Sequence, residues 1–164
     1  VSCGALTKEV AQTLGVVGLA ARASGIPMDV RSGPGYAPYD MLEVKPSVAA
    51  DGDVAARVSV RFEELFASTN LIRTISERIA PGRINMNLPL PAPGTFGLGW
   101  VEGWRGEVLI AIEAGENGRI RRCHAHDPSW QNWPALEYAV IGNIVPDFPL
   151  INKSFNLSYS GQDL

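Results

Sequence analysis

The chain has 164 residues, 46% of them apolar, and a formal net charge of −3 at pH 7. This length and apolar content suffice for one hydrophobic core or for one lobe of a larger one, so we expect a single domain over residues 1–164. The 14 lysines and arginines are scattered along the chain, which argues against a nucleic-acid-binding surface. The two cysteines, Cys3 and Cys123, form no CxxC pair, which argues against a disulfide framework and a zinc site and favours a reducing, cytoplasmic compartment.

The start of the sequence predicts a piece of a longer protein. The first residue is Val1 instead of an initiator methionine, and residues 1–10 lack the basic and apolar regions of a signal peptide. The longest apolar run, residues 14–21, contains glycines and is far shorter than the roughly 20 residues that cross a bilayer. We therefore expect a C-terminal fragment that reaches a membrane only through partner subunits.

The first quarter of the chain predicts one helix followed by a loop. Residues 7–21 are expected to form the helix, with Thr7 as its N-cap. Gly15 and Gly18 lie three positions apart, which favours close backbone packing, and neither GxGxxG nor a P-loop is present. Glycines and prolines over residues 32–46 indicate an ordered loop without regular structure.

Residues 51–79 carry the clearest periodic pattern. Apolar side chains recur at steps of three or four, which is typical of an amphipathic helix. Asp51 or Asp53 is the expected N-cap, and Pro81 with the following glycine is the expected end. Such a helix is roughly 40 Å long, so we expect other long helices beside it.

The second half of the chain predicts a small antiparallel sheet and a further helix. After a proline-rich loop at 83–97, strands are expected at 98–102, 108–113 and 119–126. Asn117-Gly118 is a strong hairpin signal between the last two strands. A helix is expected at 130–141, with Pro134 tolerated only near its first turn, and a short terminal segment from Asp147. The predicted fold class is α+β.

Four charged residues are candidates for a pocket or for its support. Glu102 and Arg105 lie three residues apart on a glycine-flanked turn, so the guanidinium either points at a buried carboxylate or anionic ligand, or forms an ion pair that fixes the turn. Asp29 and Arg31 are expected to pair, with Arg22 nearby along the chain.

Other side chains favour structural roles. His124 and His126 share one strand face, but a third metal ligand is not evident. Cys123 faces the opposite way and is expected in the core. Glu64 is expected in solvent and Glu63 nearer the buried side of the long helix, where a proton-relay role is conceivable. Aromatic residues of the second half are expected as core or interface anchors rather than as a quinone-stacking group: Trp100, Trp104, Trp130, Trp133 and Tyr138.

Several motifs in order carry a resemblance to a known family. Residues 18–31 (GLAARASGIPMDVR), residues 52–68, the Glu102-Gly103-Trp104-Arg105-Gly106 turn and Asp127-Pro128-Ser129 resemble segments of complex I and hydrogenase-4-type or formate hydrogenlyase-type large subunits. In that family the turn approaches the active-site region, and Trp104 departs from the usual proline. The resemblance implies the C-terminal lobe of a nickel-iron hydrogenase large-subunit-like fold.

The C-terminal tail resembles the metal-binding signature of nickel-iron hydrogenases without its ligands. In the Asp-Pro-Cys-x-x-Cys frame, Ser158 stands at the first cysteine and Gly161 at the second. A serine hydroxyl is a poor soft-metal ligand and glycine has no side chain, so a nickel-iron site is not expected. The tail instead resembles that of the 49 kDa-type subunits of respiratory complex I, which bind quinone. By this resemblance, Leu157, Ser158, Tyr159 and Gly161 are candidates for a pocket wall.

The resemblance implies a function for the whole protein. It would be the large subunit of an electron-transfer oxidoreductase complex of the quinone-reducing, NADH dehydrogenase type, with NAD binding and an iron-sulfur small subunit and membrane subunits as partners. It would lie on the cytoplasmic membrane through these partners, with quinone possible in the full complex and no cofactor in this fragment, which is expected to be inactive alone. A non-catalytic interaction scaffold and a degenerate membrane-bound hydrogenase are the alternatives.

Overall fold

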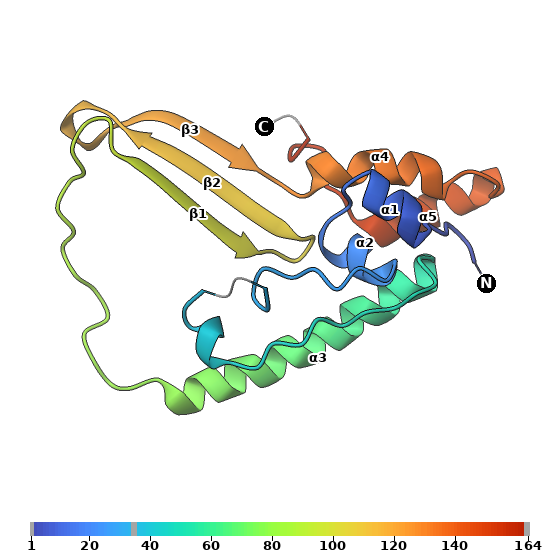
Figure 1. The fold of residues 1–164 in the computed structure, drawn as a ribbon, viewed down its shortest axis with the longest axis horizontal. Helices are drawn as coiled ribbons and strands as arrows, with labels where there is room; N and C mark the ends of the chain where they lie inside the picture. The colour runs from blue at the N-terminus through green and yellow to red at the C-terminus, as the bar shows by residue number, and fades with distance from the viewer. Residues whose placement is uncertain (1, 34–35, 163–164) are drawn as a thin grey trace.

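A computed structural model of the protein describes residues 2–33 and 36–162. Its helices are α1 (Lys8–Thr13), α2 (Gly18–Ala23), α3 (Val54–Arg78), α4 (Ser129–Ala139) and α5 (Phe148–Phe155), and its strands are β1 (Phe96–Glu102), β2 (Glu107–Ala114) and β3 (Ile120–His126). Figure 1 shows the short helices gathered at one end of the molecule, where α3 begins, while the sheet and α3 diverge towards the other end. The predicted α+β class is confirmed.

The single helix predicted over residues 7–21 is wrong, because two short helices take its place. Thr7 caps α1 as expected, since its hydroxyl accepts a hydrogen bond from the Val10 amide. Gly15 then adopts a left-handed conformation (φ 65°) that ends α1. Asn132 of α4 donates to the Val17 carbonyl and accepts from its amide, which holds Val17 extended before α2. A contact from a distant helix therefore overrides the local helical pattern.

The long amphipathic helix is confirmed as α3. Asp53 is its N-cap and accepts a 2.8 Å hydrogen bond from the Ala56 amide. Only the first turns bury side chains, at Ala56, Arg57 and Val60. Among the described residues, no other long helix covers the apolar side chains farther along α3.

The three strands form an antiparallel sheet in the order β1-β2-β3. The predicted hairpin is confirmed, with Asn117 left-handed (φ 57°) in the turn and β1 beginning two residues earlier than expected, at Phe96. Cys123 pairs with Ile112 and is exposed, so its predicted core position is wrong. The reason is that the described residues leave that face of the sheet uncovered.

The C-terminal helices differ in detail from the prediction. Pro134 lies in the second turn of α4, beyond the first turn where it was expected, and burial of Ala135, Leu136 and Ala139 offsets the lost backbone hydrogen bond. The short terminal segment expected from Asp147, for which no structure was predicted, forms α5.

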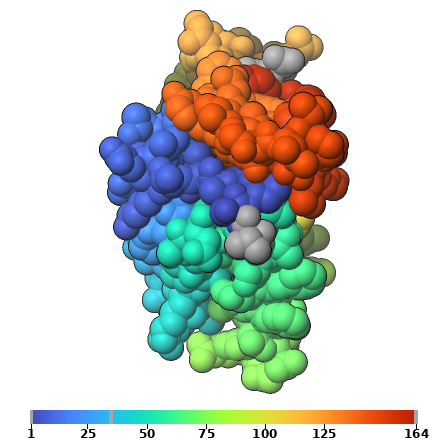
Figure 2. Space-filling view, turned by 90° about the vertical axis from the view of Figure 1, so that its right-hand side faces the viewer, coloured from blue at the N-terminus to red at the C-terminus, as the bar shows by residue number. Residues whose placement is uncertain are grey.

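The core lies between the short helices. Its fully buried apolar members are Leu6, Ala11, Val16, Ala20, Ala21, Ala135, Leu136, Ala139, Ile151 and Phe155. Figure 2 shows the α1 and α2 region between the α4 and α5 region above and α3 below. In the described part of the chain, no helix combines the length and apolar character needed to cross a membrane.

Candidate functional site

The tight turn between β1 and β2 is the junction on which the rest of the site is built. Gly103 and Gly106 close it through two backbone hydrogen bonds of 2.8 and 3.2 Å. Gly18, with φ 63°, packs directly on this turn, and a Cβ there would overlap the Arg105 carbonyl oxygen. The close approach expected from the glycine spacing therefore occurs at Gly18, whereas Gly15 faces open space.

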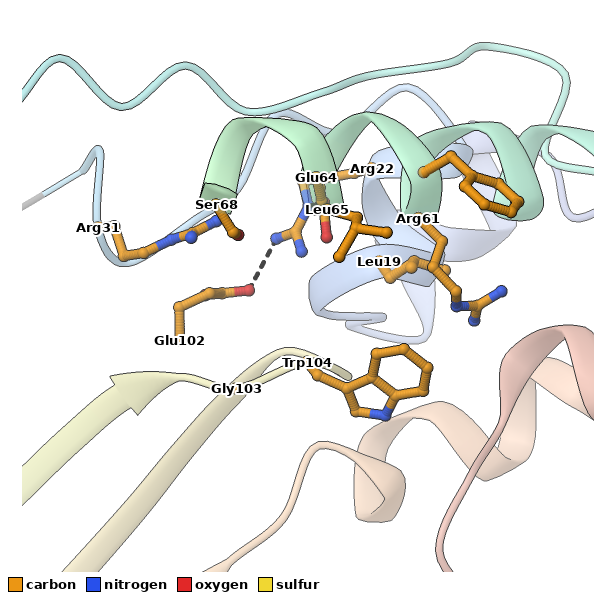
Figure 3. Close-up of a pocket in the computed structure, with 11 residues that line it drawn as sticks. Leu19, Arg22, Arg31, Arg61, Glu64, Leu65, Ser68, Glu102, Gly103 and Trp104 are labelled. Atoms are coloured by element: carbon orange, nitrogen blue, oxygen red, sulfur yellow. Dashed lines mark hydrogen bonds and ion pairs between the residues drawn. The ribbon is translucent and has the colours of Figure 1, made fainter. Parts of the chain in front are cut away.

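Arg22 of α2 ties this turn to α3. Its Nε donates to Glu64 Oε1 at 2.5 Å, and its Nη1 donates to Glu102 Oε1 at 2.8 Å. Figure 3 shows the Arg22 guanidinium between these two carboxylates. Nη1 also donates to the Met28 carbonyl at 2.8 Å, and the Arg22 side chain is fully buried. Three segments that are distant in sequence thus share one buried cation.

Asp29 and Arg31 complete this group. Arg31 donates to both carboxylate oxygens of Asp29, at 3.0 Å from Nε and 2.7 Å from Nη2, which is the bidentate geometry of a strong charged pair. Asp29 also lies 3.9 Å from Arg22 Nη1, and Glu102 accepts a hydrogen bond from the Val30 amide. We call Arg22, Asp29, Arg31, Glu64 and Glu102 the Arg22 cluster.

The Arg22 cluster has three carboxylates for two guanidiniums, and burial is the main cause of the raised pKa of Glu102. Burial raises the pKa of Glu102, the charge of Asp29 adds to this rise, and Arg22 opposes it only in part. Burial also acts to raise the pKa of Asp29, but the hydrogen bonds and charge of Arg31 outweigh it and the pKa is lowered. Of Glu102 and Asp29, Glu102 is therefore the carboxyl group that takes up a proton first as the pH falls.

The expected positions of Glu63 and Glu64 are reversed. Glu64 lies at the Arg22 cluster, whereas Glu63 is exposed and contacts Ser59 one helical turn away. The helix pattern missed this, because the side of α3 that faces Arg22 is polar and depends on where α2 packs.

Glu102 and Arg105 bind different partners. Arg105 Nε donates to the Asn156 carbonyl at 2.5 Å, while Glu102 is held by Arg22. Asn156 is left-handed (φ 55°) and ends α5, so Arg105 fixes the point where the tail begins. The two residues join the turn to α2 on one side and to the tail on the other.

The tail is held by hydrogen bonds at Ser158. Its amide donates to Ser129 Oγ at 2.9 Å, and its carbonyl accepts from Trp133 Nε1 at 3.2 Å. Its hydroxyl accepts from the Gly161 amide at 3.1 Å. Leu157 packs against the core, and exposed Tyr159 lies with its ring 5.1 Å from Trp133.

Gly161 is buried against Asp127 at the end of β3. A Cβ at Gly161 would lie 2.7 Å from Asp127 Cγ, which is closer than a side chain tolerates. Asp127 in turn accepts from the Ser129 amide at 2.8 Å and so stays in place. A cysteine side chain at position 161 would have to displace the Asp127 side chain.

A cavity of about 440 Å³ opens beside the Arg22 cluster. Its apolar wall comes from Leu19, Phe62, Leu65 and Trp104, and its polar wall from Arg22, Arg31, Arg61, Glu64, Ser68 and Glu102. Residues from α2, α3 and the β1–β2 turn therefore surround one space. Of the four pocket candidates named from charge alone, Arg31 and Glu102 line this cavity.

The remaining candidates lie elsewhere. His126 Nε2 is 2.8 Å from Gln131 Oε1 and His124 is exposed. Across residues 2–33 and 36–162, no group of three potential metal-ligating side chains is present. Among the aromatic anchors only Trp133 packs against the core, and the others are about half exposed: Trp100, Trp104, Trp130 and Tyr138.

Known proteins are similar to this chain over most of its length. Formate hydrogenlyase subunit 5 of Escherichia coli (strain K12) is 31% identical over 99% of this chain and 29% of its own length. An NADH-quinone oxidoreductase subunit of Syntrophobacter fumaroxidans is 33% identical over 94% of this chain and 42% of its own length. The chain thus spans less than half the length of these relatives.

A solved structure and a family description agree with these relatives. A chain of the membrane-bound sulfane sulfur reductase, an archaeal respiratory membrane complex, superposes with a TM-score of 0.86 and 26% identity over 98% of this chain and 46% of that chain. The family described as "Respiratory-chain NADH dehydrogenase, 49 Kd subunit" matches residues 1–95. The chain therefore belongs to the family of 49 Kd subunits of respiratory-chain NADH dehydrogenase, whose relatives include hydrogenase large-subunit-like proteins.

Proposed function

We propose that this chain is part of the large subunit of an electron-transfer oxidoreductase complex that reduces a quinone and has no nickel-iron centre. Family membership and the name of the Syntrophobacter fumaroxidans relative, an NADH-quinone oxidoreductase, support the reaction class. The chain supplies the wall and the supports of the acceptor pocket rather than the electron carrier.

The observation that carries this proposal is the packing of the tail. The nickel-iron hydrogenase frame calls for thiolates at positions 158 and 161, but Ser158 presents a hydroxyl that already binds the Gly161 amide. Gly161 has no side chain, and Asp127 fills the space that one would need. This donor set does not fit a soft metal that prefers thiolates.

The turn and the tail form one braced unit in this proposal. Arg22 holds Glu102 at the start of the turn, and Arg105 holds the Asn156 carbonyl at the start of the tail. Asp29 and Arg31 brace the same turn through the Val30 amide and Glu102. Leu157, Ser158, Tyr159 and Gly161 then line the acceptor side, because a pocket wall must keep its shape while the acceptor enters and leaves.

The proposed partners are an iron-sulfur small subunit and membrane subunits, so the complex lies peripherally on a membrane. Two relatives by name support an assembly of several subunits, and the similar solved structure comes from a respiratory membrane complex. Quinone reduction takes up two electrons and two protons per molecule, and the electrons arrive from the partner.

Turnover with a soluble quinone tests this proposal in the full-length protein within its native assembly. Arg105→Gln removes the contact with the Asn156 carbonyl and is expected to lower kcat/KM by roughly tenfold or more, as misplaced pocket walls do. Arg73→Gln is the matched control, because Arg73 is an exposed arginine of α3 away from the turn. Equal activity of the two variants would contradict a role for the turn.

A non-catalytic scaffold is the second candidate, and one observation favours it. Every carboxylate of the Arg22 cluster already has an internal partner, as in purely structural networks. The scaffold predicts that the assembly forms but shows no quinone turnover in any variant.

A further inference from the structure

Arg61 differs from the other arginines around the 440 Å³ cavity. Arg22 and Arg31 are each paired with carboxylates within 3 Å, whereas Arg61 has no carboxylate partner among residues 2–33 and 36–162. Its Nη2 donates to the Ser154 carbonyl at 2.9 Å, and its buried Nε finds no acceptor in the part of the chain that the structure describes. Burial lowers the pKa of this guanidinium, and Glu64 opposes the shift from a distance. Arg61 is thus a cation with hydrogen-bond donors that no described residue accepts from.

Trp104 places an aromatic face beside this cation. The Arg61 guanidinium lies 5.1 Å from the centre of the Trp104 ring, within the range of a cation–π contact. Figure 3 shows Trp104 reaching the cavity from the β1–β2 turn and Arg61 reaching it from α3. Trp104 is 55% exposed, so one part of its ring remains open to a ligand.

Two cavities meet at this pair. The 440 Å³ cavity adds the apolar side chains of Leu19, Phe62 and Leu65. A second cavity of about 470 Å³ is also lined by Arg61 and Trp104, with Val58 and Leu150 as its apolar wall. A ligand at the pair therefore contacts apolar surface on either side of the Arg61 guanidinium, and Lys153 adds a second cation to the wall of the second cavity.

We propose that Arg61 and Trp104 form a binding site for a small aromatic molecule that carries an oxyanion. The oxyanion accepts hydrogen bonds from the Arg61 guanidinium and supplies the negative charge that balances it. The aromatic ring stacks on the indole against Leu65. A purely apolar ligand offers no negative charge to the Arg61 guanidinium, which lines both cavities. A polar anion without a ring leaves the apolar walls in contact with water.

The site is independent of the proposed quinone reduction. Its ligand is defined by charge and ring shape alone, and binding is measured without electron transfer. Absence of quinone turnover in the unaltered protein, with intact anion binding, would count against the proposed function only, and turnover without anion binding would count against this site only.

Calorimetric titration of the full-length protein in its native assembly with naphthalene-2-carboxylate tests the site. Arg61→Gln is expected to weaken binding roughly tenfold to a hundredfold, because a hydrogen bond to a charged group is lost. Trp104→Leu is expected to weaken it roughly threefold to tenfold through lost stacking. Arg73→Gln, an exposed arginine on the same helix, is expected to change nothing.

Two comparisons guard against unspecific effects. The neutral probe naphthalene-2-carboxamide should bind to the unaltered protein more weakly than the carboxylate does. To Arg61→Gln, the two probes should bind with equal affinity. Thermal unfolding shows whether each variant is folded; if Arg61→Gln is not, Arg61→Lys and Trp104→Leu decide. No binding of the carboxylate, or binding that none of these substitutions weakens, would overturn the proposal.

Discussion

The two ends of α3 lie in opposite surroundings. Its first turns are buried, and Arg57 there donates to Ser154 Oγ and to the carbonyls of Gly4 and Gly52 while its guanidinium lies 4.1 Å from the Phe155 ring. From its middle to its end it exposes large apolar side chains, including Phe66 at 66% and Ile72 at 64%. The same helix is therefore fixed at one end and uncovered at the other.

Contacts within the chain stabilise the fixed end of α3, whereas the uncovered end presents apolar surface to other subunits. At the fixed end, specific hydrogen bonds and small buried side chains determine how the helices pack. At the uncovered end, the apolar residues continue into the extended segment after α3, at Ile79, Ile84, Met86, Leu88 and Leu90. Large apolar side chains exposed in such number are typical of an interface. The site lies between the two ends, at the Arg22 cluster.

The largest expected effect is at Gly18, where the fixed end meets the β1–β2 turn. Gly18→Ala places a Cβ on the Arg105 carbonyl, so we expect a loss of about 4 kcal/mol in the free energy of unfolding. Gly15→Ala is the matched control, because Gly15 has the same left-handed backbone but faces open space. It should cost about 1 kcal/mol. Urea denaturation measures both, and equal losses would contradict the close contact.

Glu64 and Glu63 give a comparison between neighbouring residues. Glu64→Gln removes a charge from the buried Arg22 pair and is expected to cost about 2 kcal/mol of unfolding free energy. Glu63→Gln acts on an exposed side chain and should stay within about 0.5 kcal/mol of the unaltered chain. Similar denaturation curves for the two variants would show that the Arg22 cluster adds nothing to the fixed end.

The pH dependence of stability reports on Glu102. Because its pKa is raised in the folded state, the folded chain holds more protons than the unfolded chain above the ordinary value of 4.5, and stability falls as pH rises through the folded pKa. Asp29 acts in a separate window, since its lowered pKa removes stability only as pH falls below 3.8. Glu102→Gln should abolish the slope above pH 4.5 in denaturation measured across pH. An unchanged slope would assign it to another group.

The smallest effect on stability is expected at the uncovered end. Ile72→Thr changes an exposed side chain, so the free energy of unfolding of the chain should change by no more than about 0.5 kcal/mol. In the native assembly, however, the same substitution should weaken subunit association, as measured by sedimentation. A large loss of stability in the isolated chain, with association intact, would contradict the interface.

Local patterns predicted the elements that local forces determine. The spacing of apolar residues and the carboxylate of Asp53 predict α3, and Asn117-Gly118 predicts the hairpin, because caps and turns depend on neighbouring residues. The break between α1 and α2 depends on Asn132 from α4, more than a hundred residues away, so no nearby residue signals it. For α5, apolar residues at positions 148, 151 and 155 were an available signal.

The same difference holds at the candidate site, where contacts between chain neighbours were predictable and contacts that depend on helix packing were not. The Asp29–Arg31 pair was predictable because the two residues are neighbours in the chain. The role of Glu64 was not, because it depends on the position at which α2 crosses α3. Arg61 gave no sequence signal either, since its lack of a carboxylate partner among the described residues is a property of the packed structure. For Ser158 and Gly161, the sequence suggested missing thiolates, and the contact with Asp127 adds a steric reason.

The nickel and bound-quinone content of the full-length protein, purified with its neighbouring subunits, distinguishes a quinone-reducing subunit from a hydrogenase. The packing of Ser158 and Gly161 predicts no stoichiometric nickel, together with quinone that is bound or reducible. Stoichiometric nickel would contradict the account and restore a hydrogenase. Absence of both nickel and quinone would contradict the acceptor pocket and leave the scaffold.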